Sequence, residues 1–196
     1  MMPAACCTRT GWSEKRSVMS EPLKLFPPTE EEKEEQSRKE ALELKRRLDA
    51  FAEKMNETAA RLGMRNSHFV NAHGYSAEGH YTTARDLVTA ARHGMTQALF
   101  SRIVTCLRYT LPANEQRKDP VISLKWEIFN PLSEYYIPNA AGVKSGYTST
   151  AGFCYVGAYQ ENGITLIAAV MGGQGRNMAW TDLKRLFAYG MAIENK

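Results

Sequence analysis

A cation, a hydroxyl and a glycine follow one another at Lys144, Ser145 and Gly146, within a stretch of residues typical of a β-strand. A lysine and a serine in this order can bind a substrate carboxylate through charge and a hydrogen bond. Glycine lets another backbone approach the strand closely. The run continues as Tyr-Thr-Ser-x-Ala-Gly-Phe up to Phe153, which makes it far more specific than the triplet alone. This pattern indicates the substrate-recognition strand of a serine acyl-transfer site.

A resemblance to a known family extends over most of the chain. From about Phe51 to Met191 the sequence resembles the later part of a D-alanyl-D-alanine carboxypeptidase of the low-molecular-mass penicillin-binding type. Besides the segment from Gly142 to Phe153, the matching segments are MNETAARLGM at 55–64, SHFVN at 67–71, GHYTTARDL at 79–87, GITLIAAVMGG at 163–173 and LFAYGM at 186–191. The resemblance implies an α+β fold: a partial β-lactamase/transpeptidase-like domain with an antiparallel sheet packed by helices, here with a long charged N-terminal helix. It also implies a peptidoglycan stem peptide ending in D-Ala-D-Ala as substrate, and β-lactams as ligands.

The catalytic motifs of that family are missing from this sequence. The family uses Ser-x-x-Lys for nucleophile and base, Ser-x-Asn for proton relay and Lys-(Thr/Ser)-Gly for recognition. No serine of the chain has lysine three residues later or asparagine two residues later. Both motifs are expected before the helix that contains Met55, where this chain has Glu, Lys and Arg instead. A serine hydroxyl without a positioned base is a poor nucleophile. We therefore predict no catalytic residue here and no turnover by this chain alone.

The resemblance assigns roles to the remaining site residues. Lys144 is expected to supply positive potential and to orient the relay serine, and Ser145 to hydrogen-bond the terminal carboxylate. The backbone N–H of Tyr147 is expected to be one of two oxyanion donors. Gly146 completes the strand, and Arg176 can reach a substrate carboxylate. Two alternatives stay open: Lys144 as a solvated strand-end lysine, and Arg176 as a flexible-loop arginine.

We assign no further catalytic or metal site to the histidines, to Arg85 and Asp86, or to the cysteines. His80 precedes a helix cap, and because the base of the resembled family is lysine, we do not assign it as a general base. Arg85 and Asp86 are expected to make local helix-end contacts. The four histidines include no pair at metal-binding spacing. The four cysteines also lack metal-ligand spacing and are not expected to form disulfides: Cys6, Cys7, Cys106 and Cys154. We predict no metal and no cofactor.

The amino-acid composition limits the classes of partner that we expect for this chain. The 196 residues are 43% hydrophobic and carry a formal net charge of +4. This excess of positive charge is either an ordinary solvated surface or a binding site for anionic peptides or cell-wall polymer. No basic cluster interleaved with aromatic residues argues for nucleic acid. No apolar run is long enough for a membrane span or a signal peptide. The chain as written is therefore expected to be cytoplasmic, although the resembled family acts in the cell envelope.

The chain divides into three predicted regions: a disordered segment 1–28, a charged helical extension 29–50 and an incomplete catalytic domain 51–196. Thr29 and Glu32 form a Thr-x-x-Glu capping box that predicts the start of a long helix, and Gly63 predicts its end. One face of this helix is apolar, with Leu44, Leu48, Phe51, Met55 and Leu62. Self-association of the chain through this helix is an open alternative.

The remaining pattern predicts two short helices, a hairpin, a meander and a final helix. Thr83 and Thr96 are expected to cap the two short helices. A hairpin or extended excursion is expected between 107 and 129. The predicted strands cover 143–147, 152–160 and 164–171, with a turn at 161–163, and the final helix covers 179–192. Such a partial sheet exposes an edge, so we expect marginal stability, dimerisation or aggregation.

Three functions remain in competition. The first is a D-Ala-D-Ala carboxypeptidase, which removes the terminal D-alanine through an acyl-serine and is represented here by an incomplete chain. The second is a non-catalytic module that binds cell-wall peptide or a partner. The third is an unstable product without function.

Overall fold

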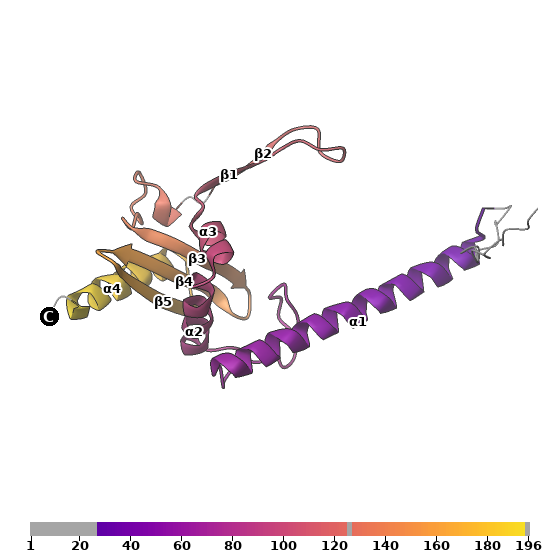
Figure 1. The fold of residues 1–196 in the computed structure, drawn as a ribbon, viewed down its shortest axis with the longest axis horizontal. Coiled ribbons are helices and arrows are strands. Elements are labelled where there is room, and N and C mark those ends of the chain that lie inside the picture. The colour runs from indigo at the N-terminus through magenta and orange to yellow at the C-terminus, as the bar shows by residue number, and fades with distance from the viewer. Residues whose placement is uncertain (1–26, 125–126, 195–196) are drawn as a thin grey trace, which may run out of the picture. The chain divides into compact units, whose positions relative to one another are not determined.

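The computed structural model describes residues 27–124 and 127–194. It divides into two compact units at the boundary between Ala41 and Leu42. Most of the predicted disordered segment lies outside the described residues, and so do Cys6 and Cys7. Figure 1 shows the helices and strands.

The first helix, α1, spans Glu30–Leu62 and begins and ends where the sequence predicts. Thr29 N donates to Glu32 Oε2 at 2.9 Å, and Glu32 N donates to Thr29 Oγ1 at 3.2 Å, which is the predicted capping box. Gly63 follows the helix with φ of 79°, a conformation that glycine adopts without strain.

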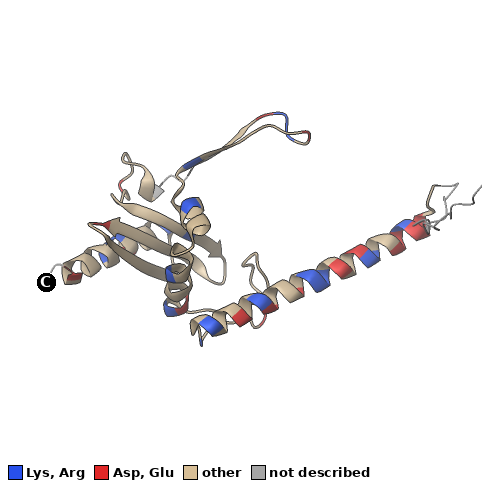
Figure 2. Cartoon of the chain, viewed as in Figure 1, with Lys and Arg blue, Asp and Glu red and all other residues tan. Residues whose placement is uncertain are grey.

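Up to Ala41, α1 is covered by exposed charges of both signs, which alternate along the helix in Figure 2. Ion pairs one helical turn apart join them, such as Lys39 Nζ with Glu35 Oε1 at 2.7 Å. The hydrogen bond from Lys39 lowers the pKa of Glu35. Exposed pairs of this kind contribute little stability, so this segment remains helical mainly through capping and helix propensity.

The sheet contains three antiparallel strands in the order β3-β4-β5. These strands are β3 (Ala140–Thr148), β4 (Gly152–Glu161) and β5 (Ile164–Gly173), each longer than predicted. Asn162 and Gly163 both have positive φ in the turn between β4 and β5, as the Asn-Gly pair predicts. The α+β class and the antiparallel meander are confirmed.

The last helix, α4 (Arg176–Glu194), packs on one face of the sheet, and α2 and α3 lie on the other face (Figure 1). Gly157 allows the close approach of α4, because a Cβ at this position would lie 2.7 Å from Leu183 Cδ2. The core between α4 and the sheet consists of buried residues: Ile128, Ile137, Tyr155, Trp180, Leu183 and Phe187.

Helix α2 spans Ala84–Met95 and α3 spans Ala98–Thr105. Thr83 caps α2 as predicted, since its side chain accepts a hydrogen bond from Asp86 N. The prediction that Thr96 caps α3 is wrong. Thr96 keeps a right-handed helical conformation, and its N–H bonds back to the last carbonyls of α2, so it ends that helix instead.

The predicted excursion between the helices and the sheet is a hairpin of β1 (Arg108–Leu111) and β2 (Val121–Leu124). A short 3-10 helix follows at Glu127–Phe129. Within the described part of the chain, no helix combines the length and the apolar character that crossing a membrane requires.

Candidate functional site

The Lys-Ser-Gly triplet lies on β3, which pairs with β4 and with no further strand of the described sheet. Ser145 pairs with Tyr155, and Tyr147 pairs with Phe153. Paired residues of antiparallel strands point to the same face. Ser145 and Tyr147 therefore lie on the face that α4 covers, and the Tyr147 and Phe153 ring centroids are 4.4 Å apart.

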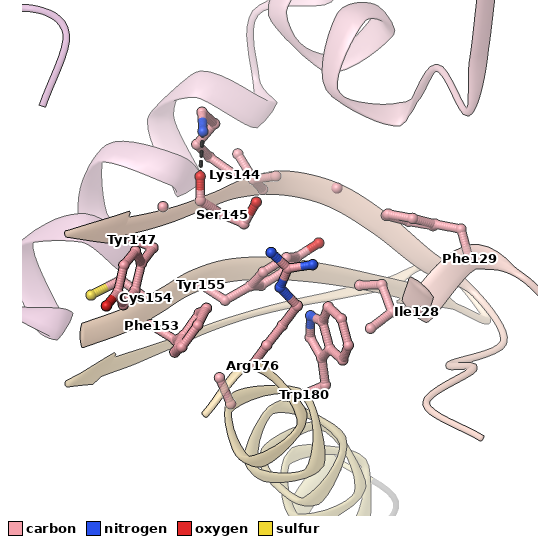
Figure 3. A pocket seen from close by; sticks show the side chains of 14 residues that line it. Ile128, Phe129, Lys144, Ser145, Tyr147, Phe153, Cys154, Tyr155, Arg176 and Trp180 are labelled. Carbon is pink, nitrogen blue, oxygen red and sulfur yellow. Dashed lines mark hydrogen bonds between the residues drawn. The ribbon is translucent and has the colours of Figure 1, made fainter. Parts of the chain in front are cut away.

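A cavity of about 500 Å³ opens at this face (Figure 3). Its volume falls within the range of about 300–1,000 Å³ that is usual for small-molecule sites. All five predicted substrate-binding residues line it: Lys144, Ser145, Gly146, Tyr147 and Arg176. The structure thus brings together, around one hollow, residues that are up to thirty-two positions apart in the sequence.

Arg176 is the first residue of α4 and not a loop residue. The predicted start of this helix at residue 179 is wrong, because Ala179 N already donates to Gly175 O at 3.2 Å and so extends the helix backwards. The Arg176 guanidinium carbon lies 5.9 Å from the ring centroids of both Phe153 and Trp180. Figure 3 shows the guanidinium group directed into the cavity, beside Tyr155 and Trp180. Contact with two aromatic faces holds the charged group in this direction.

Lys144 leaves β3 on the opposite face from Ser145, because successive side chains of a strand alternate. It is exposed, and its Nζ donates to the backbone oxygen of Ser145, the contact drawn in Figure 3. Its charge therefore lies at the strand edge, whereas Arg176 reaches the cavity from the helix side.

The cavity favours an anionic ligand. Among the described residues that line it, the charged ones are Lys144 and Arg176, and no carboxylate is present. The opposite wall is apolar and includes Ile128 and Trp180, which are 1% and 7% exposed. Burial raises the pKa of Tyr155, so its hydroxyl stays protonated and can donate a hydrogen bond. The Arg176 cation beside an apolar wall suits a carboxylate attached to a small apolar group, and Lys144 adds positive charge at the strand edge.

The histidines and Asp86, which the sequence analysis did not accept as bases or metal ligands, lie outside the cavity. His80 does not line the cavity; its Nδ1 accepts a hydrogen bond from Val70 N at 3.0 Å, and burial lowers its pKa. Asp86 is buried and accepts from Asn66 N and Ser67 Oγ, so its carboxylate joins the start of α2 to a distant segment of the chain and does not make only the local contacts expected. No group of three metal-binding side chains occurs in the residues that the structure describes.

The sequence analysis did not identify several of the residues that line the cavity. Phe153 and Tyr155 could have been identified in advance, because the short turn after Thr148 fixes which residues of β3 and β4 pair. Trp180 lies one helical turn after Arg176, so the two side chains share one face of α4. The sequence analysis did not place Arg176 in this helix and therefore could not pair the two residues. Cys154 also lines the cavity, as a free and partly buried thiol.

Comparison with known proteins gives consistent results. A D-alanyl-D-alanine carboxypeptidase of Streptomyces sp. strain K15 is 29% identical over 147 residues, which cover 75% of this chain and 50% of that protein. A relative of the same name from Bacillus subtilis is 30% identical over 124 residues, covering 63% of this chain and 30% of the relative. The crystal structure of the Streptomyces K15 DD-transpeptidase matches with a TM-score of 0.62 and 30% identity, over 72% of this chain and 54% of that one.

A D-alanyl-D-alanine carboxypeptidase structure from Mycobacterium tuberculosis also matches, with a TM-score of 0.61 and 28% identity, over 72% of this chain and 53% of that one. The chain thus spans between about a third and a half of the length of the curated relatives compared here. The family model described as D-alanyl-D-alanine carboxypeptidase matches residues 47–175, which include the Lys-Ser-Gly strand, its hairpin partner and helices α2 and α3, but not α4. By this match, the chain belongs to the D-alanyl-D-alanine carboxypeptidase family.

Proposed function

We propose that this chain supplies the substrate-recognition side of a D-Ala-D-Ala carboxypeptidase site and does not form the acyl-enzyme by itself. The observation that carries the proposal is the cavity in which the Ser145 hydroxyl and the Arg176 guanidinium meet an apolar wall. The ligand is a peptide ending in D-Ala-D-Ala, and β-lactams are ligands of the same class.

The terminal carboxylate of the peptide binds to Ser145 and Arg176 through charge-assisted hydrogen bonds. The terminal methyl group packs against the apolar wall formed with Trp180. The peptide backbone lies along β3, in the manner of a strand added to a sheet edge. Gly146 supports this approach, because no heavy atom lies within 4 Å of the position that a Cβ would occupy there.

The chemical step requires groups that this sequence does not contain. Attack on the peptide carbonyl needs a serine whose proton a base accepts, and no serine here has the Ser-x-x-Lys spacing. Without that pair, the backbone N–H of Tyr147 stabilises no tetrahedral intermediate, since none forms. The second candidate, a non-catalytic module that binds cell-wall peptide, is supported by the same observation and differs in requiring no further polypeptide.

Two measurements on the purified chain test the proposal. Intact mass after incubation with a β-lactam is expected to stay unchanged; a stoichiometric covalent adduct would show a working nucleophile and refute the absence of chemistry. Calorimetric titration with a peptide ending in D-Ala-D-Ala is expected to show saturable binding, and a peptide ending in L-Ala-L-Ala serves as control. Equal binding of both peptides, or binding of neither, refutes recognition at this site.

A further inference from the structure

A second hydroxyl borders the cavity besides that of Ser145. Tyr155 lies on β4 directly opposite Ser145 in the strand pairing, so the two side chains leave the sheet on the same face. Both residues line the cavity of about 500 Å³, together with Arg176 at the start of α4. Figure 3 shows the three side chains around the hollow, Ser145 and Tyr155 from neighbouring strands and Arg176 from the helix. Two hydroxyls and one guanidinium therefore border the same space.

The Tyr155 side chain is buried, yet its hydroxyl has no hydrogen-bond partner among the residues that the structure describes. The residue is 8% exposed, and its ring belongs to the core formed with Trp180 and Leu183. The oxygen still reaches open space: within 27–124 and 127–194, the only side-chain N or O atom that is both fully enclosed and unpartnered is Arg117 Nε. Buried tyrosine hydroxyls are usually paired within the protein. This one is instead an unused donor at the wall of the cavity.

The Tyr155 hydroxyl is suited to donate a hydrogen bond to an anion. Burial raises the pKa of this phenol, so it remains neutral and keeps its proton. Its neighbours in the wall are also donors, because the Ser145 hydroxyl can donate and the Arg176 guanidinium only donates. No described residue that lines the cavity carries a carboxylate. Three donors without a charged acceptor suit one planar anion, since a carboxylate has two oxygens with about four lone-pair positions.

We propose that the Tyr155 hydroxyl is a specificity-determining donor, which completes with Ser145 and Arg176 a three-donor pocket for the terminal carboxylate of the ligand. The inference rests on the proposed function for the identity of that ligand, a peptide ending in D-Ala-D-Ala. It adds a binding residue on β4, outside the Lys-Ser-Gly triplet. It also predicts selection, because a neutral C-terminal amide has one oxygen and brings its own N–H donors against the three donors of the pocket.

The test titrates the full chain and its Tyr155→Phe variant with two peptides by calorimetry. Both peptides end in D-Ala-D-Ala, one with a free carboxylate and one with a C-terminal amide. Tyr155→Phe removes only the hydroxyl. It is expected to weaken binding of the free-acid peptide about ten- to a hundredfold, because a hydrogen bond to a charged group is lost. The amide peptide is expected to bind both proteins equally weakly.

Tyr159→Phe is the matched control. Tyr159 lies on the same strand and the same face as Tyr155, but its hydroxyl donates to Glu161 Oε2 at 2.9 Å and the residue does not line the cavity. Its replacement is expected to leave peptide affinity unchanged and to lower the urea midpoint, because a hydrogen bond within the protein is lost. Tyr155→Phe is expected to leave the urea midpoint unchanged or to raise it, because its hydroxyl has no such partner.

Each other outcome overturns a named part of the reasoning. If the wild type binds the free-acid peptide and Tyr155→Phe binds it equally well, the inference is refuted and the proposed function stands. An equal loss for both peptides shows that the hydroxyl does not bind the carboxylate. A fall in urea midpoint as large as that of Tyr159→Phe shows that the hydroxyl is paired within the protein, which also refutes the inference.

N-acetyl-D-alanine, titrated by NMR in parallel, decides the case in which the wild type binds neither peptide. That case refutes the proposed function. Weaker binding of this small carboxylate to Tyr155→Phe than to the wild type would then retain the three-donor pocket. Equal binding to both proteins, or binding to neither, would refute the pocket as well.

Discussion

Gly157 on β4 lies where α4 packs closely on the sheet, and this contact holds Arg176 and Trp180 at the site. A Cβ on Gly157 would lie 2.7 Å from Leu183 Cδ2 and 3.1 Å from Phe187 Cζ. Leu183 is 0% exposed and Phe187 is 3% exposed, so neither side chain has open space to move into. We therefore expect Gly157→Ala to force α4 away from the sheet and to destabilise the protein.

The magnitudes follow from packing. Overfilling a core costs about 1–3 kcal/mol, reduced by about 0.4–1 kcal/mol because alanine restricts the unfolded chain more than glycine does. Leu183→Ala leaves a cavity and is expected to cost about 2–5 kcal/mol. In the double variant the new methyl group of residue 157 occupies part of the space that Leu183 vacated. The double variant should therefore be more stable than the sum of the single effects predicts, by about 1–2 kcal/mol.

Urea unfolding of the wild type, both single variants and the double variant measures this coupling. The fits should share one m-value, so that changes in midpoint report changes in stability. If the two effects add within about 0.5 kcal/mol, the residues do not interact as described and the packing of α4 on β4 is wrong. A stabilising Gly157→Ala variant would refute the argument equally.

Three further predictions concern the site and its supports. Arg176→Gln is expected to weaken binding of a D-Ala-D-Ala peptide by about ten- to a hundredfold in calorimetry, because a charged hydrogen bond is lost; unchanged affinity would remove Arg176 from the site. The folded-state pKa of His80 is lowered by burial, so its contribution to stability is fully present above its ordinary pKa of about 6.5 and is lost as the pH falls through the lowered value. His80→Asn keeps an acceptor for Val70 N–H but does not titrate, and melting temperatures across this pH range should fall less steeply in the variant; identical slopes would contradict the assignment. Asp86→Ala is expected to cost about 1–3 kcal/mol in urea unfolding, since it removes the acceptor of Ser67 Oγ and of the Asn66 N–H, both in partly buried hydrogen bonds, whereas a loss below about 0.5 kcal/mol would show that water replaces the carboxylate.

The sequence predicted the elements well where local chemistry decides them. Thr29, Gly63 and Asn162 act through hydrogen bonds and backbone conformations within a few residues, so their roles in capping, helix termination and the hairpin turn were readable in advance. Thr96 shows the limit of such reasoning. Its residue type suits a helix start, but it ends the preceding helix instead, because its N–H is already used by the carbonyls of α2.

The sequence by itself determined the family, the Lys-Ser-Gly strand and the absence of the nucleophile motifs, since each depends only on the order of residues along the chain. The tertiary structure decided which side chains share the cavity. Trp180 and Tyr155 meet Arg176 because α4 packs on the sheet at Gly157, a contact between segments that no local pattern encodes. It also decided that Leu44, Leu48 and Phe51 stay exposed: their spacing defines an apolar face, but only the packing of the rest of the chain determines whether that face is covered.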